Sequence, residues 1–597
     1  MRKVVFTIVM LSAAAAAAQA PAGERIFTAR CASCHNGQPD SRAPGLDALK
    51  SRTPQAVIDA LTNGAMRVQG AQMNGIDRRA VAEYVTGKQV AEDVTGSATG
   101  RCTKATPIGD ITRGSHWSGW SPALTNARFQ PADQAGLAVS DLSRLTLKWA
   151  FGFPDAASAW AQPTIAGGRV FVGSQNGTVF SLDAATGCIQ WTFTANGGVR
   201  TAITIGKTGG RTVAYFGDTA ANAYALDAGT GKQIWIRKVD DHPLARVTGS
   251  PALFEDRLYV PVSSYEESQG ADPNYACCTF RGNVNALDAK TGAVIWKTYM
   301  VADMPTPRGK SSAGVQLWGP SGSAIWSPPT IDPKRRLLYV ATGNTYSGPP
   351  QPSSDALVAV DLKTGAITWT KQATPSDIYI TGCGRSANPN CPETNGPDVD
   401  FGSPPILTTT AAGRDLIVIG QKSGVGWAFD PDKNGEVVWQ YRAGEGGALG
   451  GIEWGSAVDG ARAYFAVSDI TRPKPGGLHA VSLASGERLW TAAPPAPKCG
   501  SGRGCNGAQS AALTVIPGAI FSGSNDGALR AYSTKDGTVI WEFDSNREFE
   551  TVNGVKGHGA SMIGPGPAIS GGMLFVNSGY GAFGGRAGNV LLAFSVN

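Results

Sequence analysis

The chain has 597 residues, of which 42% are hydrophobic and 16% charged, and its formal net charge is +6. This length allows more than one hydrophobic core, so at least two domains are expected. The basic residues are scattered, which argues against nucleic acid as a partner, and no segment after residue 20 has the roughly 18 consecutive apolar residues of a transmembrane helix.

Residues 1–20 predict an export signal. Arg2 and Lys3 form a basic start, residues 4–18 form an apolar core, and Ala18-Gln19-Ala20 provides a cleavage site with small residues at both ends. The chain also contains ten cysteines, a content that fits an oxidising compartment. We therefore expect an exported, periplasmic protein.

The segment Cys31-Ala32-Ser33-Cys34-His35 predicts a covalently bound haem. Two thiols at this spacing can each add to a haem vinyl group, and the adjacent imidazole then becomes the proximal ligand of the iron. A zinc site is disfavoured because no second cysteine pair of suitable spacing lies nearby. Cys31 and Cys34 are thus expected to attach a haem c, with His35 bound to iron.

Residues 21–90 predict a small all-α cytochrome c domain, with helices at 23–35, around 58–61 and at 77–85. An electron-transfer haem usually has a second axial ligand, commonly methionine. Met66 lies in a loop ahead of the last helix and is our expected ligand. Met73 is the alternative, although it occupies a position that packing residues usually fill.

After a linker at 91–115, the chain repeats one pattern seven times: a strand, the turn Asp-x-x-Thr-Gly or a variant of it, and a second strand containing tryptophan. The aspartate caps the turn, glycine adopts a positive φ, and the indole supplies apolar area between sheets. Short strands at a regular interval predict a β-propeller. The repeat tryptophans are Trp191, Trp235, Trp296, Trp369, Trp439, Trp490 and Trp541.

An eighth copy is divided between the two ends of this region. Residues 590–594 have the first strand of the unit, and residues 145–151 have the tryptophan strand. Pairing them would close the ring and remove its exposed edges. The expected fold is therefore an all-β eight-bladed propeller over residues 116–597, preceded by the cytochrome c domain.

Three disulfides are expected in the linker and the propeller. Two pairs lie close together in loops that contain glycine or asparagine, and a third pair is left by elimination. The expected pairs are Cys383 with Cys391, Cys499 with Cys505, and Cys102 with Cys188.

Together, the export signal, the c-type haem motif and the eight blades resemble the quinohaemoprotein alcohol dehydrogenases that use pyrroloquinoline quinone (PQQ). The N-terminal position of the haem is similar to that in polyvinyl alcohol dehydrogenases, whereas other members carry the haem at the C-terminus. The resemblance covers nearly all of the chain and implies PQQ, haem c and Ca²⁺ as cofactors.

The resemblance assigns several residues to PQQ. It places Trp326 beneath the quinone, where a flat indole suits a flat ring. Thr248 and Ser263 match residues that bind the quinone. Arg200 corresponds to the partner of a PQQ carboxylate, and Lys422 to a cation near the quinone oxygens.

It also implies a calcium site and a catalytic base. Glu266, Asn344 and Asp400 supply the oxygen ligands that Ca²⁺ prefers, with the adjacent Glu267 as an alternative to Glu266. Asp400 corresponds to the base that takes the proton of the substrate hydroxyl while hydride moves to the quinone. Asp398, two residues earlier, competes for that role.

Cys277 and Cys278 are adjacent, and the family uses such a vicinal disulfide above the quinone. Other members carry it shortly before the arginine that corresponds to Arg200, but here it follows Glu266. We predict that it still reaches the upper face of the quinone, with Arg281 as a second contact. The alternative is that the two cysteines bond to separate partners.

The resemblance implies oxidation of secondary alcohol groups to ketones, with polyvinyl alcohol as the expected polymer substrate. Electrons would pass from PQQ to haem c and then to an external cytochrome c or another acceptor. One alternative is a PQQ-haem dehydrogenase of small alcohols, sugars or aldehydes. An alternative from another class is a non-catalytic propeller scaffold with an electron-transfer domain.

Overall fold

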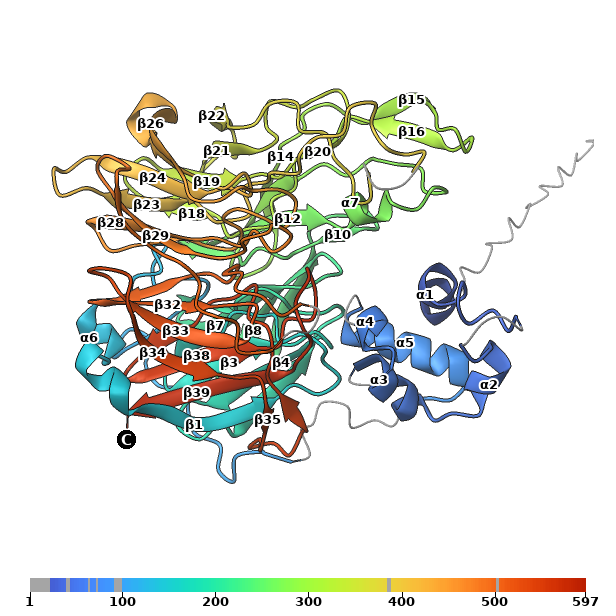
Figure 1. The fold of residues 1–597 in the computed structure, drawn as a ribbon, viewed down its shortest axis with the longest axis horizontal. Coiled ribbons are helices and arrows are strands. Elements are labelled where there is room, and N and C mark those ends of the chain that lie inside the picture. The colour runs from blue at the N-terminus through green and yellow to red at the C-terminus, as the bar shows by residue number, and fades with distance from the viewer. Residues whose placement is uncertain are drawn as a thin grey trace, which may run out of the picture. The chain divides into compact units, whose positions relative to one another are not determined.

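A computed structural model describes residues 22–38, 43–62, 65–70, 73–90, 99–383, 388–500 and 504–596. The expected export signal lies outside these residues. The chain divides into two compact units (Figure 1). The first contains the described residues up to Asp59 together with Asp77–Val90, and the second contains Ala60–Ile76 and the chain from Ala91 onward. No helix in the described part of the chain is long and apolar enough to cross a membrane.

The N-terminal region is helical, as predicted. Its helices are α1 (Ala22–Arg30), α2 (Leu46–Lys50), α3 (Pro54–Thr62), α4 (Arg67–Gly70) and α5 (Gly75–Thr86). Within the first unit, the buried ring of Phe27 on α1 lies 5.7 Å from that of Tyr84 on α5 and 6.4 Å from that of His35, between centroids. Aromatic packing therefore joins the haem motif to the last helix of this unit.

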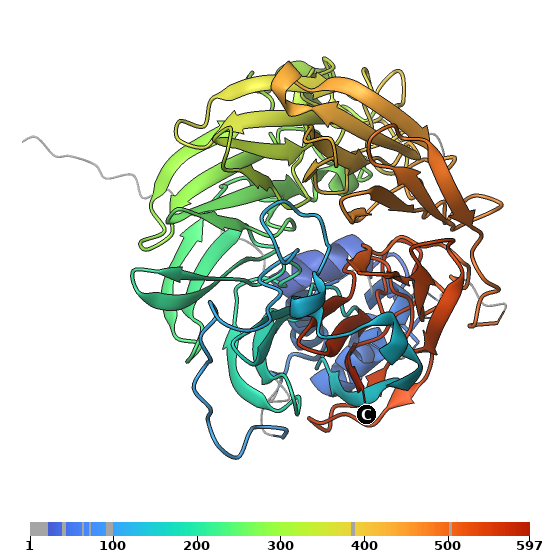
Figure 2. The ribbon, with the colours of Figure 1, turned by 90° about the vertical axis from the view of Figure 1, so that its left-hand side faces the viewer.

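The second unit contains eight antiparallel sheets of the propeller type, and successive sheets follow one another around a ring (Figure 2). Blade 1 has β2 (Thr164–Ala166), β3 (Arg169–Gly173), β4 (Thr178–Asp183) and β5 (Ile189–Thr194). Blade 2 has β6 (Thr204–Thr208), β7 (Arg211–Gly217), β8 (Asn222–Asp227) and β9 (Gln233–Lys238). Blade 3 has β11 (Ala252–Phe254), β12 (Arg257–Ser264), β13 (Asn283–Asp288) and β14 (Val294–Tyr299), with β10 (Ala245–Arg246) added to β12. Blade 4 has β18 (Thr330–Asp332), β19 (Leu337–Ala341), β21 (Ala356–Asp361) and β22 (Ile367–Gln372).

The second half of the ring repeats the same order. Blade 5 has β23 (Ile406–Thr409), β24 (Asp415–Gly420), β25 (Val425–Asp430) and β26 (Glu436–Arg442). Blade 6 has β27 (Ala457–Val458), β28 (Arg462–Ala466), β29 (Leu478–Ser482) and β30 (Arg488–Ala492). Blade 7 has β31 (Thr514–Ile516), β32 (Ala519–Gly523), β33 (Ala528–Ser533) and β34 (Val539–Asp544). Blade 8 has β37 (Ala568–Ser570), β38 (Met573–Ser578), β39 (Val590–Val596) and β1 (Leu145–Gly152).

Short elements lie between these strands. They are α6 (Ala132–Ala135), the 3₁₀ turns η1 (Val139–Arg144) and η2 (Pro431–Lys433), α7 (Glu266–Gln269), and the two-stranded ribbons β15 (Thr306–Lys310) with β16 (Gln316–Gly319), β17 (Ser321–Gly322) with β20 (Thr345–Ser347), and β35 (Glu548–Phe549) with β36 (Gly557–His558).

The predicted eighth blade is confirmed. β1 pairs antiparallel with β39, from Leu145 opposite Val596 to Gly152 opposite Val590. The last strand of the propeller sequence thus sits beside the first, and the ring closes without a free edge at this junction.

The repeat motif makes a contact between neighbouring blades. Asp183 accepts hydrogen bonds from the backbone N–H of Thr186 at 2.9 Å and from its hydroxyl at 2.8 Å, which fixes the turn. Gly187 follows at φ +75°, and a Cβ there would lie 2.8 Å from the indole of Trp149 in the preceding blade. That indole donates from Nε1 to the carbonyl of Ala184 at 3.1 Å. The same bond recurs from Trp191 to Ala228, Trp235 to Ala289, Trp296 to Leu362, Trp439 to Leu483 and Trp490 to Thr534.

Residues 117–130, here called the hub segment, bind the first strands of six blades. Its backbone contacts include Trp117 N–H to the Ile165 carbonyl (2.7 Å), and its carbonyls accept from strands β18, β23, β27 and β31. The Gln130 amide donates to the Ile569 carbonyl of β37 at 2.9 Å. Buried Arg128 donates to the carbonyl of Leu513 and, at 3.2 Å, to that of Pro567. The segment therefore ties the inner strands of the ring together.

The expected disulfides Cys102–Cys188, Cys383–Cys391 and Cys499–Cys505 are confirmed, and Cys277 bonds to Cys278. Cys102 belongs to the predicted linker 91–115, and the adjacent Arg101 forms a parallel bridge with Ile189. The described part of that linker is thus fastened to blade 1. The boundaries 21–90, 91–115 and 116–597 stay predictions.

Candidate functional site

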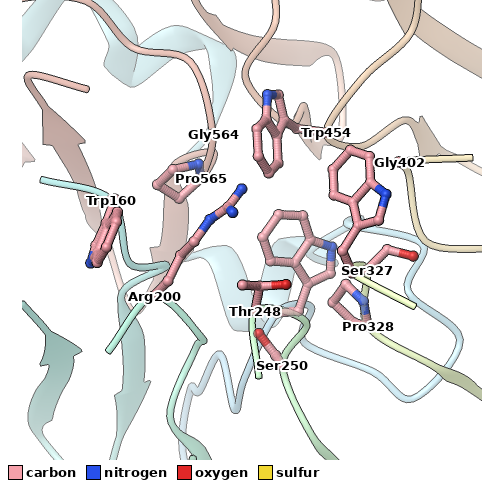
Figure 3. A pocket seen from close by; sticks show the side chains of 12 residues that line it. Trp160, Arg200, Thr248, Ser250, Ser327, Pro328, Gly402, Trp454, Gly564 and Pro565 are labelled. Carbon is pink, nitrogen blue, oxygen red and sulfur yellow. The ribbon is translucent and has the colours of Figure 1, made fainter. Parts of the chain in front are cut away.

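A small cavity lies where the loops before the first strands of seven blades converge (Figure 3). Four tryptophans dominate its wall: Trp120 comes from the hub segment, and Trp160, Trp326 and Trp454 come from loops that lead into β2, β18 and β27. Among the predicted residues, Arg200, Thr248 and Trp326 line it. Flat apolar walls with few polar groups suit a planar ring system.

Trp326 is held flat against one side of this cavity. A Cβ on Gly402 would lie only 2.1 Å from the edge of the Trp326 ring, so glycine is needed for this close approach. Trp454 meets Trp326 edge to face, with ring centroids 5.3 Å apart and planes at 74°. The indole of Trp326 therefore has its orientation fixed from two sides.

Arg200 has hydrogen-bonding capacity left unused. Its guanidinium carbon lies 4.3 Å from the centroid of Trp454, and its buried Nη2 has no hydrogen-bond partner among the described residues. Burial lowers the pKa of the guanidinium, which remains a cation at neutral pH. A buried N–H without an acceptor costs stability, so the position fits an anionic ligand such as a carboxylate of PQQ.

Thr248 and Ser263 form a pair on the same side. The Thr248 hydroxyl lies 2.7 Å from that of Ser263, and only Thr248 lines the cavity. Ser263 is buried behind it and donates to the carbonyl of Arg246 at 3.3 Å. Ser263 is therefore placed to orient Thr248.

Asp400 lies at the centre of a hydrogen-bonded group. It accepts from the backbone N–H of Asn344 at 2.8 Å through Oδ1 and from Trp326 Nε1 at 3.1 Å through Oδ2. The ammonium of Lys422 lies 3.7 Å from the same Oδ2 and forms an ion pair with Asp398. Both aspartates and Lys422 are buried, each with at most 6% of its surface exposed.

Burial and neighbouring charges shift the pKa of Asp398 and that of Lys422. Burial raises the pKa of Asp398 to about 7; repulsion by Asp400 adds to the rise and attraction by Lys422 opposes it. For Lys422, burial alone favours the neutral amine, but Asp398, Asp400 and Glu267 together raise its pKa. The group therefore contains more carboxyl groups than its single lysine can neutralise, and a further cation would stabilise it.

The structure separates the two neighbouring glutamates. Glu266, the expected calcium ligand, is fully buried and accepts hydrogen bonds from the Tyr275 hydroxyl at 2.8 Å and from the N–H groups of Thr279 and Phe280 at 2.8 and 2.7 Å. Burial raises its pKa, but these donors and His242 outweigh burial and lower it. Its carboxylate is thus already occupied within the fold.

The charges of Asp398 and Asp400 act on the neighbouring Glu267. Burial, followed by repulsion from Asp398 and Asp400, raises the pKa of Glu267 well above its usual value. Its Oε1 accepts from the Thr381 hydroxyl at 3.3 Å. The hydrogen bonds of Glu266 and the electrostatic coupling of Glu267 distinguish the two side chains, and the choice of calcium ligand between them stays a prediction.

Asn344 supplies an unused oxygen acceptor. Its Nδ2 donates to the carbonyls of Thr345 and Tyr379 at 3.0 and 2.8 Å, while its buried Oδ1 has no partner among the described residues. An amide oxygen beside carboxylates is a donor set that fits Ca²⁺. Within the described chain no three acidic, histidine or cysteine side chains form a metal-binding group by themselves. A calcium shell would therefore need the Asn344 oxygen and atoms of a bound cofactor.

The vicinal disulfide lies next to this region without lining the cavity. Cys277 and Cys278 are both buried, in an apolar cluster against which Trp326 packs. Its contact with the quinone stays a prediction. Arg281 is directed elsewhere, because its guanidinium lies 3.8 Å from the centroid of Tyr299 and donates to the carbonyls of Val301 and Ala302.

The haem motif is arranged for iron binding. The Nδ1 of His35 lies 2.8 Å from the Pro44 carbonyl, which fixes the ring and leaves Nε2 as the nitrogen for iron. Neither Cys31 nor Cys34 is in a disulfide, so both thiols suit haem attachment. Met66 is half-buried and Met73 is 2% exposed. The choice between the two methionines stays a prediction.

Sequence reasoning missed Trp120, Trp160 and Trp454, although a usable signal was present. All three lie outside the blade repeat, as Trp326 does. A tryptophan that does not pack between blades must be accounted for elsewhere, and these three line the cavity.

Three family models and a solved structure match parts of this chain. The family described as "Glucose/ethanol/alcohol dehydrogenase, beta-propeller domain" matches residues 240–440. The family of cytochrome c oxidase cbb3-type subunit III matches residues 18–85, and that of the outer membrane assembly factor BamB matches 138–312 and 474–597. The crystal structure of the quinohaemoprotein alcohol dehydrogenase from Comamonas testosteroni superposes with a TM-score of 0.60 at 18% identity, over 84% of this chain and 83% of that one, which shows a shared fold.

The fold, the cavity and these matches define a PQQ-dependent oxidoreductase with a fused cytochrome c domain. The polyvinyl alcohol dehydrogenase of a Pseudomonas species is 40% identical over 98% of this chain and 95% of its own length. That of Sphingopyxis sp. strain 113P3 is 40% identical over 96% and 93%. The chain belongs to the polyvinyl alcohol dehydrogenase family.

Proposed function

We propose that this protein oxidises secondary alcohol groups of polyvinyl alcohol to ketones in the periplasm and passes the electrons through haem c to an external cytochrome c or another acceptor. The observation that carries the proposal is the position of Asp400. Its carboxylate is held by Trp326 and Asn344 beside Lys422, and Trp326 also lines the cavity with three other tryptophans.

In this proposal each residue has a defined task. Asp400 accepts the proton of the substrate hydroxyl at a carboxylate oxygen, and Lys422 limits the build-up of negative charge next to it. Trp326 supports the face of the ring, and Arg200 binds a carboxylate. When bound, PQQ would take the hydride from the substrate carbon, and Ca²⁺ would make its carbonyl a better acceptor.

We further propose Glu267, Asn344 and Asp400 as the protein ligands of Ca²⁺. The unused oxygen of Asn344 and the repulsion between Glu267 and Asp400 support this set. At the haem, Cys31 and Cys34 form the covalent links and His35 and Met66 bind iron, in accordance with the motif and the orientation of His35.

The deciding experiment supplies purified protein with PQQ and Ca²⁺ and follows the absorbance of the reduced haem. Polyvinyl alcohol and a small secondary alcohol should reduce the haem faster than ethanol or glucose. Faster reduction by ethanol, glucose or an aldehyde would instead indicate a dehydrogenase of small substrates. No reduction by any alcohol, together with no binding of PQQ, would leave a non-catalytic propeller fused to a cytochrome.

A further inference from the structure

The carboxylate of Asp377 holds the chain immediately before Asp400. Its Oδ1 accepts from the backbone N–H of Asp398 at 3.2 Å, and its Oδ2 accepts from that of Val399 at 2.8 Å. Asp377 is fully buried, so these bonds are shielded from water. One side chain therefore fixes the two residues that precede the proposed base.

The clamped turn has an unusual backbone. Asp398 adopts φ +57°, in the left-handed region that non-glycine residues seldom occupy. This conformation allows Asp398 and Asp400 to approach the same ammonium group, that of Lys422. Such a conformation persists only where surrounding contacts enforce it, and both oxygens of Asp377 contact this turn.

The same short segment also binds the other side of the site. The Asp377 carbonyl accepts from the N–H of Thr345 at 3.1 Å, and the Thr345 carbonyl accepts from the N–H of Tyr379 at 2.9 Å. The Tyr379 carbonyl in turn accepts from the side chain of Asn344 at 2.8 Å. Residues 377–379 thus connect the proposed base with the proposed calcium ligand.

A carboxylate is the side chain that this geometry needs. Both oxygens must accept, whereas the amide of asparagine has one acceptor and would set its NH₂ against a backbone N–H. Burying another acid near Asp398 and Asp400 costs stability, and the two backbone hydrogen bonds to the turn offset that cost.

We propose that Asp377 is a positioning residue for the oxidation: by clamping the left-handed turn at Asp398 it sets the distance and direction of Asp400 toward the substrate hydroxyl. The proposal rests on the function proposed above. It adds a residue that does not contact substrate or cofactor.

The test compares two variants that loosen the clamp in different ways. Asp377→Asn removes one acceptor. Gly396→Ala keeps every charge, but its Cβ would lie 2.0 Å from Asp377 Oδ1 and 2.7 Å from the backbone nitrogen of Ile378, so it would displace the carboxylate together with the backbone that carries it. Asp332→Asn is the control, because Asp332 is a buried aspartate of blade 4, in the turn between β18 and β19, that accepts from the backbone N–H of Arg335 at 3.0 Å and from its guanidinium at 2.9 Å.

Two measurements are made on the full-length protein with PQQ and Ca²⁺. Both clamp variants should lower kcat for alcohol-dependent haem reduction by at least about tenfold, with KM and PQQ affinity changed less than about threefold, because misplacement of the base affects the chemical step. Hydrogen exchange of the peptide covering residues 396–401 should accelerate in both variants. Asp332→Asn should change neither kcat nor the exchange rate of this peptide.

The outcomes separate this inference from the proposed function. Wild-type kcat in both clamp variants, or unchanged exchange of the 396–401 peptide, would overturn the positioning role even if the enzyme is active. An inactive wild type would instead refute the proposed function, and the exchange measurement would still decide whether Asp377 clamps the turn. If Asp377→Asn shows no cooperative unfolding transition, Gly396→Ala carries the decision alone.

Discussion

The indole Nε1 of Trp326 donates to Oδ2 of Asp400 at 3.1 Å, so the floor of the cavity and the proposed base form one hydrogen-bonded unit. The Asn344 N–H occupies the other oxygen of Asp400, and Lys422 lies beside it. Any displacement of the Trp326 ring is therefore transmitted to Asp400, the proposed base. The predictions below test this arrangement and its surroundings.

Asp400→Asn should retain PQQ binding but lose alcohol-dependent haem reduction by roughly 10²- to 10⁴-fold, because an amide cannot take up the hydroxyl proton. Asp398→Asn serves as the matched control and should reduce the rate less. The measurements are haem reduction and equilibrium binding of PQQ. A greater loss in Asp398→Asn would transfer the role of base to that residue.

Glu267→Gln should raise the Ca²⁺ concentration for half-maximal activation by at least about tenfold, because one charged oxygen ligand is lost. Glu266→Gln should leave this concentration nearly unchanged but lower the thermal midpoint, because its amide cannot accept all the hydrogen bonds of the buried carboxylate. Calcium titration of activity and thermal unfolding distinguish the two. The opposite pattern would restore Glu266 as the ligand.

Glu453 should make the protein without PQQ less stable at alkaline pH. Burial raises the pKa of Glu453 to about 7, although Lys422 and two serine hydrogen bonds oppose the rise. The folded state therefore binds this proton more tightly than the unfolded state, whose carboxyl has a pKa near 4.5. The contribution to stability is fully present below about pH 4.5 and is lost as pH rises through about 7, which amounts to about 3 kcal/mol.

Glu453→Gln removes that titration. Relative to wild type, the variant should gain stability between pH 5 and pH 8, as measured by denaturant midpoints at both values. Glu436→Gln, an exposed control, should follow the wild type. If stability depends on pH in the same way in wild type and Glu453→Gln, the assignment of this titration to Glu453 is wrong.

Asp355→Gly should raise the free energy of unfolding by at least about 1 kcal/mol. Asp355 precedes β21 at φ +46°, where blades 1, 5, 6 and 7 have a glycine of positive φ, and both of its buried oxygens lack hydrogen-bond partners among the described residues. Burial, and then repulsion by Asp400, raises the pKa of Asp355, so the gain should be larger at pH 7 than at pH 4.

Ala221→Gly is the matched control for this substitution. Ala221 holds the same position in blade 2 at φ +55° without a charge, so this variant reports the backbone contribution alone. Thermal unfolding at both pH values gives the difference. A destabilised Asp355→Gly variant would show that the carboxyl has a partner essential to the fold.

Met66→Ala should change the haem spectrum and shift its reduction potential, because an axial methionine raises the potential of a c-type haem. Met73→Ala should destabilise the protein while leaving the spectrum unchanged, because Met73 is almost fully buried. Spectroelectrochemistry measures both effects. If only Met73→Ala alters the spectrum, Met73 is the ligand.

The fold was readable from the sequence because each blade repeats a physical contact. The aspartate fixes a turn, and the glycine lets that turn lie on the tryptophan of the preceding blade, as Gly187 does on Trp149. The hub segment could not be predicted in the same way. It has no periodic pattern, and its bonds join residues 117–130 to strands far away in sequence.

The site was predictable in outline through the family resemblance, and its details depended on tertiary contacts. Arg200, Trp326, Asn344, Asp400 and Lys422 come from separate blades or loops, and the structure brings them together. The choice between the adjacent Glu266 and Glu267 could not be made from their order. It depends on donors such as Tyr275, which no local pattern reveals.

Closure of the ring through β1 and β39 has a consequence for the order of folding. Blade 8 takes its outer strand from the beginning of the propeller sequence and its other three from the end. The chain therefore cannot complete this blade until strand β39, which ends at Val596, is available. A chain that stops before β39 would leave the facing edges of β1 and β38 unpaired, so the first and last blades would not be joined.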